Sequence, residues 1–341
     1  MLHFDCDYME GACPEVMRRL AETNMEQTPG YGTDRYTKEA VELIRQACAQ
    51  PEAEVHFLVG GTQTNATVID GLLRRHEGVL AAETAHINVH EAGAIEACGH
   101  KVLVLPQHDG KLRAADVERY TTDFYRDETY EHMVAPGMVY ISHPTELGTL
   151  YTRAELEELS QTCHRLHLPL YLDGARLAYG LVAANADLTL PDVARLCDAF
   201  YIGGTKTGAL FGEAVVARRG LLPRFFTLVK QHGALMAKGR LLGLQFATLM
   251  ADGLYLRLAR HAVGQAMRLK QGFLSAGYRC HIDSPTNQQF FCLPNETIDR
   301  LSTKATFEIW GTRGENESVT RFVTSWATRP EAVDELLSYL E

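Results

Sequence analysis

The stretch DAFYIGGTKTGALFGEAVV, residues 198–216, places two short apolar runs on either side of a glycine-rich turn that contains Lys206. Short apolar runs of this kind are typical of strands buried on both faces of a sheet. A lysine among glycines and apolar residues is costly unless it has a partner or a chemical task. Lysines more often reach the surface, but the flanking glycines disfavour that alternative here. The stretch therefore predicts a buried sheet with a functional lysine just past a strand end.

Similar apolar runs recur along the first two thirds of the chain and alternate with helical patterns. The predicted strands are 54–59, 78–83, 101–106, 137–142, 168–173, 198–203 and 212–217, and the predicted helices are 62–76, 152–167 and 191–197. This alternation predicts an α/β fold with a mostly parallel, seven-stranded sheet and helices on both faces. In such sheets the functional groups lie at the carboxyl ends of the strands.

The pattern changes after about residue 229. A long helical stretch over 229–255 leads into a second one over 254–277. Short strands are then predicted at 288–294, 305–311 and 319–326, followed by a last helix over 330–341. We expect a large domain over residues 1–250 and a smaller α+β domain over 251–341, with the segment 1–20 able to pack on the small domain.

Composition narrows the class of protein. The 341 residues carry a formal net charge of −10, which argues against nucleic acid or an anionic membrane as the partner. The longest apolar stretch, 241–256, is interrupted by polar residues and is too short to span a bilayer. The eight cysteines form no C-x-x-C motif, and the acidic start does not resemble a secretory signal. We expect a cytoplasmic enzyme with reduced thiols.

Two strand ends carry candidate binding residues in the first half of the chain. Gly60 and Gly61 follow the first strand, and Thr62 begins the next helix. Glycines and free amides at a helix start form an anion cradle, although a plain strand-to-helix turn has the same pattern. His86 follows the second strand, where an imidazole reaches a cleft or is simply solvated. Nearby His90 and Glu91 do not complete a metal-ligand pattern, and no metal site is predicted.

Three further strand ends add polar groups. The loop 142–146 reads Ser-His-Pro-Thr-Glu, which fits a polar turn as well as a site. Asp173 ends an apolar strand and needs a cationic partner, for which Arg176 is a candidate; an ion pair that only shapes a turn is the alternative. Lys206 follows the next strand, where a lowered pKa would make it a nucleophile toward an aldehyde.

A phosphate cradle, a histidine, a strand-end aspartate and a strand-end lysine, in this order, are the parts that pyridoxal 5′-phosphate (PLP) requires. The motifs YGTDRYT at 31–37, GGTQTN at 60–65, AHINVHEAGA at 85–94, LDGARL at 172–177 and TRFVTSW at 320–326 carry a resemblance over nearly the whole chain. The chain resembles the threonine aldolase and β-eliminating lyase family of fold-type I PLP-dependent enzymes.

The resemblance implies roles for individual residues. Lys206 would form the Schiff base with PLP, Asp173 would pair with the pyridine nitrogen, and His86 would stack on the ring and act as a base or orient one. The implied cofactor ligands also include Gly61, Thr62, Gln63, Arg176 and Thr205. The implied substrate-binding residues are Cys6, Tyr31, Thr145, Arg176 and Arg321, the last because a guanidinium suits a two-point carboxylate contact.

Two segments depart from the family pattern. The family's histidine in the loop after the fourth strand falls on Thr145, with His143 close by in sequence. The family's arginine that reaches a neighbouring subunit's phosphate falls on Ala237, with Lys238 and Arg240 as possible substitutes. The first departure keeps alternatives open.

Three functions fit these residues. The first is cleavage of a small β-hydroxy-α-amino acid, such as L-threonine or L-allo-threonine, to glycine and an aldehyde. The second is β-elimination, which gives a 2-oxo acid and ammonia, and the third is a PLP-binding protein without turnover. The resemblance also implies a homodimer or homotetramer with active sites shared between subunits.

Overall fold

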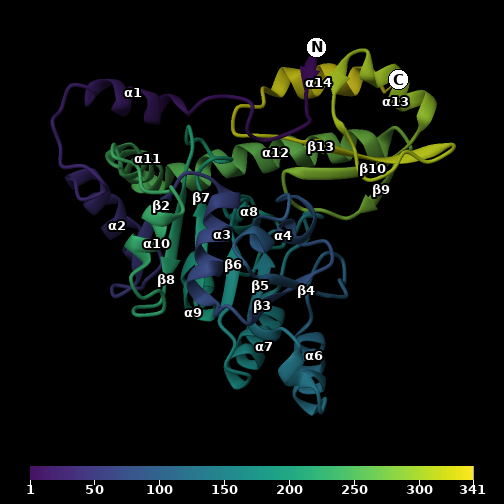
Figure 1. The fold of residues 1–341 in the computed structure, drawn as a ribbon. Helices are drawn as coiled ribbons and strands as arrows, with labels where there is room; N and C mark the ends of the chain where they lie inside the picture. Colours follow the sequence, from purple (N-terminus) through teal and green to yellow (C-terminus); the bar gives the residue numbers. More distant parts are fainter. Residues whose placement is uncertain (341) are drawn as a thin grey trace.

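A mostly parallel, seven-stranded sheet forms the centre of the computed structural model, which describes residues 1–340. Its strands are β2 (Glu54–Leu58), β3 (Glu77–Ala82), β4 (Lys101–Leu105), β5 (Ala135–Ser142), β6 (Leu170–Asp173), β7 (Ala199–Gly203) and β8 (Glu213–Ala217). Their spatial order is β2-β8-β7-β6-β5-β3-β4, and only β8 runs antiparallel to its neighbours. All seven predicted strands are confirmed to within two residues at either end, and Figure 1 shows the helices that cover the sheet.

Helices cover both faces of this sheet, and its central strands are therefore buried on both sides. The helices of the large unit are α1 (Pro14–Glu22), α2 (Arg35–Ala47), α3 (Gly61–Leu72), α4 (His86–Val89), α5 (Ala94–Ala97), α6 (Ala114–Arg126), α7 (Arg153–Arg165), α8 (Leu177–Val182), α9 (Leu190–Leu196), α10 (Phe225–Gln231) and α11 (Arg240–Met250), with 3₁₀ turns η1 (Tyr130–His132) and η2 (Ala251–Gly253). The three helices predicted between the strands correspond to α3, α7 and α9 and are confirmed.

A 22-residue helix, α12 (Leu254–Ser275), connects the large unit to a smaller one (Figure 1). The smaller unit contains an antiparallel sheet of β9 (Arg279–Ile282), β10 (Gln288–Pro294), β12 (Glu308–Ile309) and β13 (Glu317–Val323), together with α13 (Asn295–Ser302) and α14 (Pro330–Ser338). The N-terminal β1 (Leu2–His3) pairs with β11 (Ala305–Thr306), so Leu2 and Phe4 belong to the core of the smaller unit. Within α12, Val263 belongs to the core of the large unit and Leu269 to the core of the small unit.

The predicted continuous helix over 229–255 is wrong. Helix α10 ends at Gln231, and Gly233 has a left-handed backbone with φ +68° that stops it. The chain resumes as α11 at Arg240 and breaks again at Asp252, whose φ is 51°. The glycines of this stretch were the signal for the first break. Over residues 1–340, no helix combines the length and the apolar character that crossing a membrane requires.

Candidate active site

Two adjoining cavities lie where the strands of the large sheet end. The first has a volume of about 420 Å³ and is bordered by the loops that follow β2, β3, β5, β6 and β7. The second, of about 280 Å³, lies toward the small unit and is lined by Gln288, Glu308, Trp310 and Arg321. Both are lined by Tyr8, His86, Glu146, Arg176 and Lys206. A volume of this size suits a small-molecule site.

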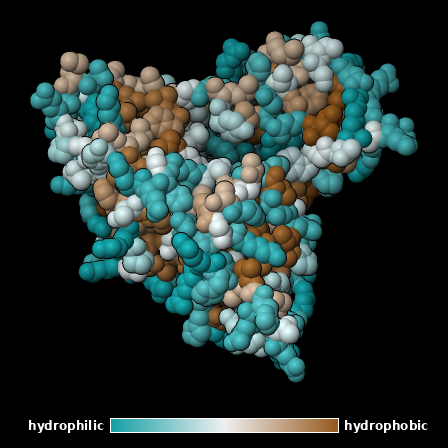
Figure 2. Space-filling view, in the orientation of Figure 1, coloured by the Kyte–Doolittle hydropathy of each residue, from teal (hydrophilic) through white to brown (hydrophobic). Residues whose placement is uncertain are grey.

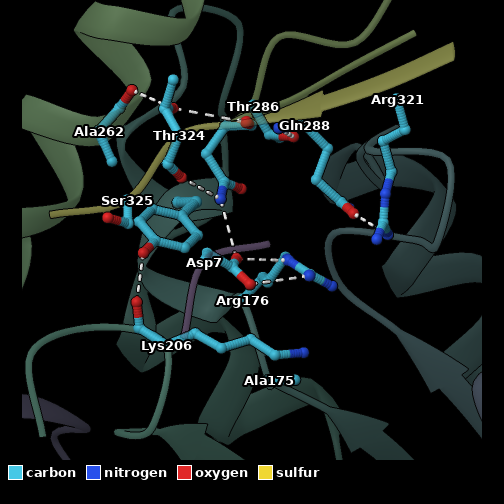
Figure 3. Close-up of polar contacts among 12 residues, drawn as sticks. Asp7, Ala175, Arg176, Lys206, Ala262, Thr286, Gln288, Arg321, Thr324 and Ser325 are labelled. Atoms are coloured by element: carbon cyan, nitrogen blue, oxygen red, sulfur yellow. Dashed lines mark hydrogen bonds and ion pairs between the residues drawn. The ribbon is translucent and has the colours of Figure 1, made fainter. Parts of the chain in front are cut away.

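Lys206 extends into this space from the loop after β7. Among residues 1–340 its ammonium forms no hydrogen bond or ion pair, and its Nζ atom lies 5.7 Å from the centroid of the Tyr8 ring. Figure 3 shows the side chain beneath Arg176 with its amine end free. Burial and the positive charge of Arg176 lower the pKa of Lys206. A lysine with a lowered pKa is neutral for a larger fraction of the time and is therefore the better nucleophile.

Asp173, at the end of β6, is held by four hydrogen bonds. One carboxylate oxygen accepts from the Tyr201 hydroxyl at 2.5 Å and the Ala175 amide at 2.9 Å. The other accepts from Asn65 at 2.9 Å and the Tyr140 hydroxyl at 2.7 Å. Burial alone would raise the pKa of Asp173, but these hydrogen bonds, together with His86 when that imidazole is protonated, outweigh burial and lower that pKa. Asp173 is therefore a buried, ionised carboxylate facing the cavity.

A chain of hydrogen bonds fixes the orientation of His86. Its Nδ1 lies 2.7 Å from the fully buried Glu91 carboxylate, which also accepts from Asn65 at 2.8 Å. A carboxylate partner places the proton of a neutral imidazole on Nδ1. The Nε2 atom is then an acceptor, and within residues 1–340 it has no hydrogen-bond partner. Since Asn65 also donates to Asp173, this one amide connects the two groups.

The anion cradle is formed by two loops. Helix α3 begins at Gly61 after Gly60, which provides no side-chain cap, so the first amides of the helix remain free to bind an anion. Gly60, Gly61, Thr62 and Thr205 all line the first cavity. A side chain at position 61 would come within 3.2 Å of the Tyr201 hydroxyl, so glycine keeps the cradle open.

Arg176 is bound on one side by a buried carboxylate. Its Nε and Nη2 atoms donate to the two oxygens of Asp7 at 2.8 and 3.0 Å (Figure 3). Asn287 donates to Asp7 at 2.9 Å. Burial would raise the pKa of Asp7, but Arg176, Lys206 and these hydrogen bonds lower it overall. Asp7 therefore joins the N-terminal segment, the large unit and the small unit at the site.

Arg321 approaches the second cavity from β13. It donates to Gln288 at 3.0 Å, forms an ion pair with Glu308 and lies 5.0 Å from the Trp310 ring centroid. Burial and the charge of Arg176 lower the pKa of Arg321. The guanidinium groups of Arg176 and Arg321 both line the second cavity, and together they favour binding of a carboxylate ligand there.

The loop after β5 presents Thr145 and Glu146 to the cavity, whereas His143 points away from it. Glu146 accepts from Ser142 at 2.6 Å and from the His86 amide at 3.0 Å, and burial raises its pKa. Thr145 lies 2.6 Å from Thr149, hydroxyl to hydroxyl. His143 accepts from the Tyr151 amide at 3.3 Å, and burial lowers its pKa to about 4. No imidazole of this loop therefore reaches the cavity.

Three predicted site residues line neither cavity. Gln63 turns its side chain back toward the Val59 amide, at 3.4 Å, and only its neighbours line the cavity. Cys6 lies beside Tyr8 outside both cavities, and its pKa is raised by burial. Tyr31 is 45% exposed, its backbone amide donates to the Ala237 carbonyl at 3.1 Å, and it borders neither cavity. The binding roles implied for these three residues stay predictions.

Several residues of the site received no role from the sequence. They are Asp7, Asn65, Glu91, Glu146, Tyr201 and Glu213. Two of these residues carried a signal in the sequence. Glu213 is the one charged residue at the start of an otherwise apolar strand, and Asp7 lies in an acidic run near the N-terminus. The remaining residues resemble ordinary helix or loop positions.

The sheet order, the small antiparallel unit and the strand-end lysine and aspartate define the fold class as that of a fold-type I α/β enzyme. A model of the beta-eliminating lyase family matches residues 4–293. The low specificity L-threonine aldolase of Pseudomonas aeruginosa is 31% identical over 337 residues, covering 98% of this chain and 95% of that protein. The chain therefore belongs to the beta-eliminating lyase family.

Solved structures agree with this assignment. The structure of the Leishmania major threonine aldolase superposes with a TM-score of 0.97 at 44% identity, covering 100% of this chain and 98% of that chain. The aspartate aminotransferase of Thermus thermophilus has a TM-score of 0.73 at 14% identity, covering 99% and 90% of the two chains. The second similarity concerns the fold alone.

Proposed function

We propose that this protein is a PLP-dependent lyase that cleaves a small β-hydroxy-α-amino acid, such as L-threonine or L-allo-threonine, to glycine and an aldehyde. The observation that carries the proposal is the Lys206 amine in one cavity with the ionised Asp173 and an anion cradle. The full-length similarity to proteins named threonine aldolase supports the choice of reaction.

The residues present fit PLP. The free amides at Gly61 and Thr62 and the Thr205 hydroxyl suit its phosphate, Asp173 suits the protonated pyridine nitrogen, and Lys206 suits its aldehyde. When bound, the cofactor supplies an electron sink for the bond that breaks at the substrate Cα. Asp173 would keep the ring nitrogen protonated, because four hydrogen bonds hold its own negative charge in place.

The substrate-facing groups have separate tasks. Arg321 and the free side of Arg176 bind the amino acid's carboxylate. His86 accepts the β-hydroxyl proton at Nε2, since Glu91 holds the Nδ1 proton and stabilises the imidazolium that forms. Glu146 fixes the start of α4 through the His86 amide and so maintains the position of this base.

β-Elimination is the alternative reaction, and one observation favours it. The loop after β5 offers a threonine hydroxyl where the aldolase pattern has an imidazole, and His143 faces the protein interior. Removal of the α-proton by the Lys206 amine followed by loss of a β-substituent would need no base at the β-hydroxyl. Product analysis separates the two reactions.

The proposal extends to assembly and location. Figure 2 shows apolar side chains gathered where Figure 1 places α1 and α11. Met17 is 47% exposed on α1, and Met25 just beyond it is 88% exposed. An apolar face of this kind suits contact with a second copy, so we propose a homodimer or homotetramer, with Tyr31 contributing to the partner's site. We also propose that the protein is located in the cytoplasm.

Borohydride trapping tests the cofactor assignment. The purified protein is incubated with PLP, reduced with borohydride and digested for mass spectrometry. We expect a phosphopyridoxyl group on Lys206 in wild type and in the matched variant Lys230→Ala. The Lys206→Ala variant should lack this group, and labelling of other lysines should be the same in all three proteins. Labelling of wild type and Lys230→Ala at Lys206 supports the assignment, whereas absence of label at Lys206 rejects it.

A further inference from the structure

Glu213 is a buried carboxyl group that none of the steps above uses. It begins β8, is 3% exposed and lines the same cavity as Thr205 and Lys206. One of its oxygens accepts from the Gly204 amide at 3.0 Å, and the other lies 2.8 Å from the Thr205 hydroxyl oxygen. Thr205 in turn accepts from the Gly212 amide at 3.0 Å. The carboxyl group therefore contacts the hydroxyl that we assign to the phosphate.

The protonation state of Glu213 decides what this hydroxyl can do. If Glu213 is ionised, it only accepts, and the Thr205 proton must point at it. If Glu213 is a neutral acid, it donates its own proton to Thr205 Oγ1. Together with the Gly212 amide this fills both acceptor positions of the oxygen, and the Thr205 proton is free to point elsewhere. Only the neutral acid leaves Thr205 able to donate to a phosphate oxygen.

The surroundings of Glu213 favour the neutral acid. Burial raises the pKa of Glu213 to about 8, and the negative charge of Asp173 acts in the same direction. The hydrogen bonds with Thr205 and the Gly204 amide and the positive charge of Lys206 oppose this and lower the pKa, but burial outweighs them. Of the neighbouring elements, β6, β7 and α12 contribute the tyrosines Tyr171, Tyr201 and Tyr255, and β2 places Leu58 opposite Glu213. A phosphate dianion in the cavity would add a further charge that disfavours the carboxylate.

We propose that Glu213 is a positioning residue for the phosphate of the cofactor: as a neutral acid it donates to Thr205 and thereby turns the Thr205 hydroxyl toward the phosphate. The proposal rests on the cofactor assignment above. It has a consequence for protons. Above about pH 8 the free protein holds Glu213 partly ionised, so phosphate binding there must take up a proton from solvent. Below that pH the acid is already neutral, and no uptake at Glu213 is expected.

The test uses pyridoxine 5′-phosphate, which has the phosphate but no aldehyde and therefore forms no bond to Lys206. Its affinity and proton uptake are measured by calorimetry in two buffers of different ionisation enthalpy, at about pH 7 and about pH 9.5. The matched variant is Glu213→Gln, whose amide oxygen can accept from Gly204 and whose amide nitrogen can donate to Thr205. This variant mimics the neutral acid at every pH, and the ligand's own ionisations are the same in both proteins.

Near neutral pH the two proteins should bind within about threefold of one another. At the higher pH, wild-type affinity should fall by up to about tenfold per pH unit relative to Glu213→Gln, and wild type should take up close to one additional proton. Equal uptake and equal affinity in both proteins at the higher pH would overturn the proposal. So would a Glu213→Gln variant that binds at least tenfold more weakly at neutral pH.

A second comparison covers the case in which Glu213→Gln does not fold. Wild type should take up more protons at the higher pH with pyridoxine 5′-phosphate than with pyridoxine, and equal uptake would reject the proposal. Borohydride trapping at Lys206 reports the proposed function separately. A labelled Lys206 without phosphate-dependent proton uptake rejects the role of Glu213 alone, whereas absence of both label and pyridoxine 5′-phosphate binding rejects both.

Discussion

Replacement of Asp7 by asparagine should destabilise the protein strongly although Asp7 belongs to neither central sheet nor helix. Asp7 is fully buried and accepts three hydrogen bonds, two of them from the Arg176 guanidinium. Removing one partner of a buried ion pair leaves an uncompensated charge and lowers stability by about 3–5 kcal/mol. The Arg176 side chain is 13% exposed and borders a cavity that water reaches, so we expect the lower end of that range, about 3 kcal/mol.

The assay is urea unfolding of the protein without added cofactor, with Glu52→Gln as the matched control. Glu52 pairs with Arg219, but both side chains are more than 70% exposed, and loss of an exposed pair changes stability by less than about 1 kcal/mol. The double variant Asp7→Asn/Arg176→Met removes both charges and should recover part of the loss. If Asp7→Asn and Glu52→Gln lower the free energy of unfolding equally, the buried pair does not connect the two units as described.

The pH dependence of this pair has a definite sign. The pKa of Asp7 is lower in the folded protein than in the unfolded chain, where it is about 3.9. Its contribution is therefore fully present above about pH 4 and is lost as the pH falls through the lower, folded value. Wild type should lose this part of its stability in acid, and Asp7→Asn should not.

Four further predictions concern other residues of the site and its surroundings. Asp173→Asn should still bind cofactor but lower kcat by about 10²–10³-fold, because the ring nitrogen loses its charged partner; unchanged kcat in a steady-state assay would contradict this role. Asn65→Ala should lower kcat by about tenfold while leaving KM within about threefold, because Asp173 and Glu91 lose their shared donor. Glu308→Gln should lower the KM for the amino acid by a few fold, since Arg321 loses a competing carboxylate; a higher KM would show that Glu308 supports binding instead. His143 has a pKa of about 4 in the folded protein and about 6.5 in the unfolded chain, so as the pH falls the unfolded chain takes up this proton first. The free energy of unfolding should fall by up to about 3 kcal/mol as the pH drops from about 6.5 to about 4, and His143→Gln should weaken this pH dependence.

Apolar strands were predictable because burial on both faces leaves a continuous signal in the sequence. The strand ending at Asp173 and the strand before Lys206 were located within two residues, and the strand-end rule then placed both side chains at one edge of the sheet. The breaks around Gly233 and Asp252 were missed because helical periodicity continues across them while left-handed backbone angles interrupt the helix.

Partners contributed by distant segments were not predictable. Asp7 meets Arg176 across 169 positions in the chain, and Asn65 meets Asp173 across 108, and no local pattern encodes such pairs. The orientation of His143 was also open in sequence, because the loop's letters do not say which side chains face the cavity. The division into domains at residue 250 remains a prediction, and the two cores meet within α12.

Product analysis tests the central proposal most directly. The protein reconstituted with PLP is given L-threonine and L-allo-threonine, with Lys206→Ala as the inactive control, and glycine, aldehyde, 2-oxo acid and ammonia are all measured. We predict glycine and acetaldehyde in equal amounts from wild type and neither from Lys206→Ala. A 2-oxo acid and ammonia in their place would show that this site performs elimination, and would contradict the proposed cleavage.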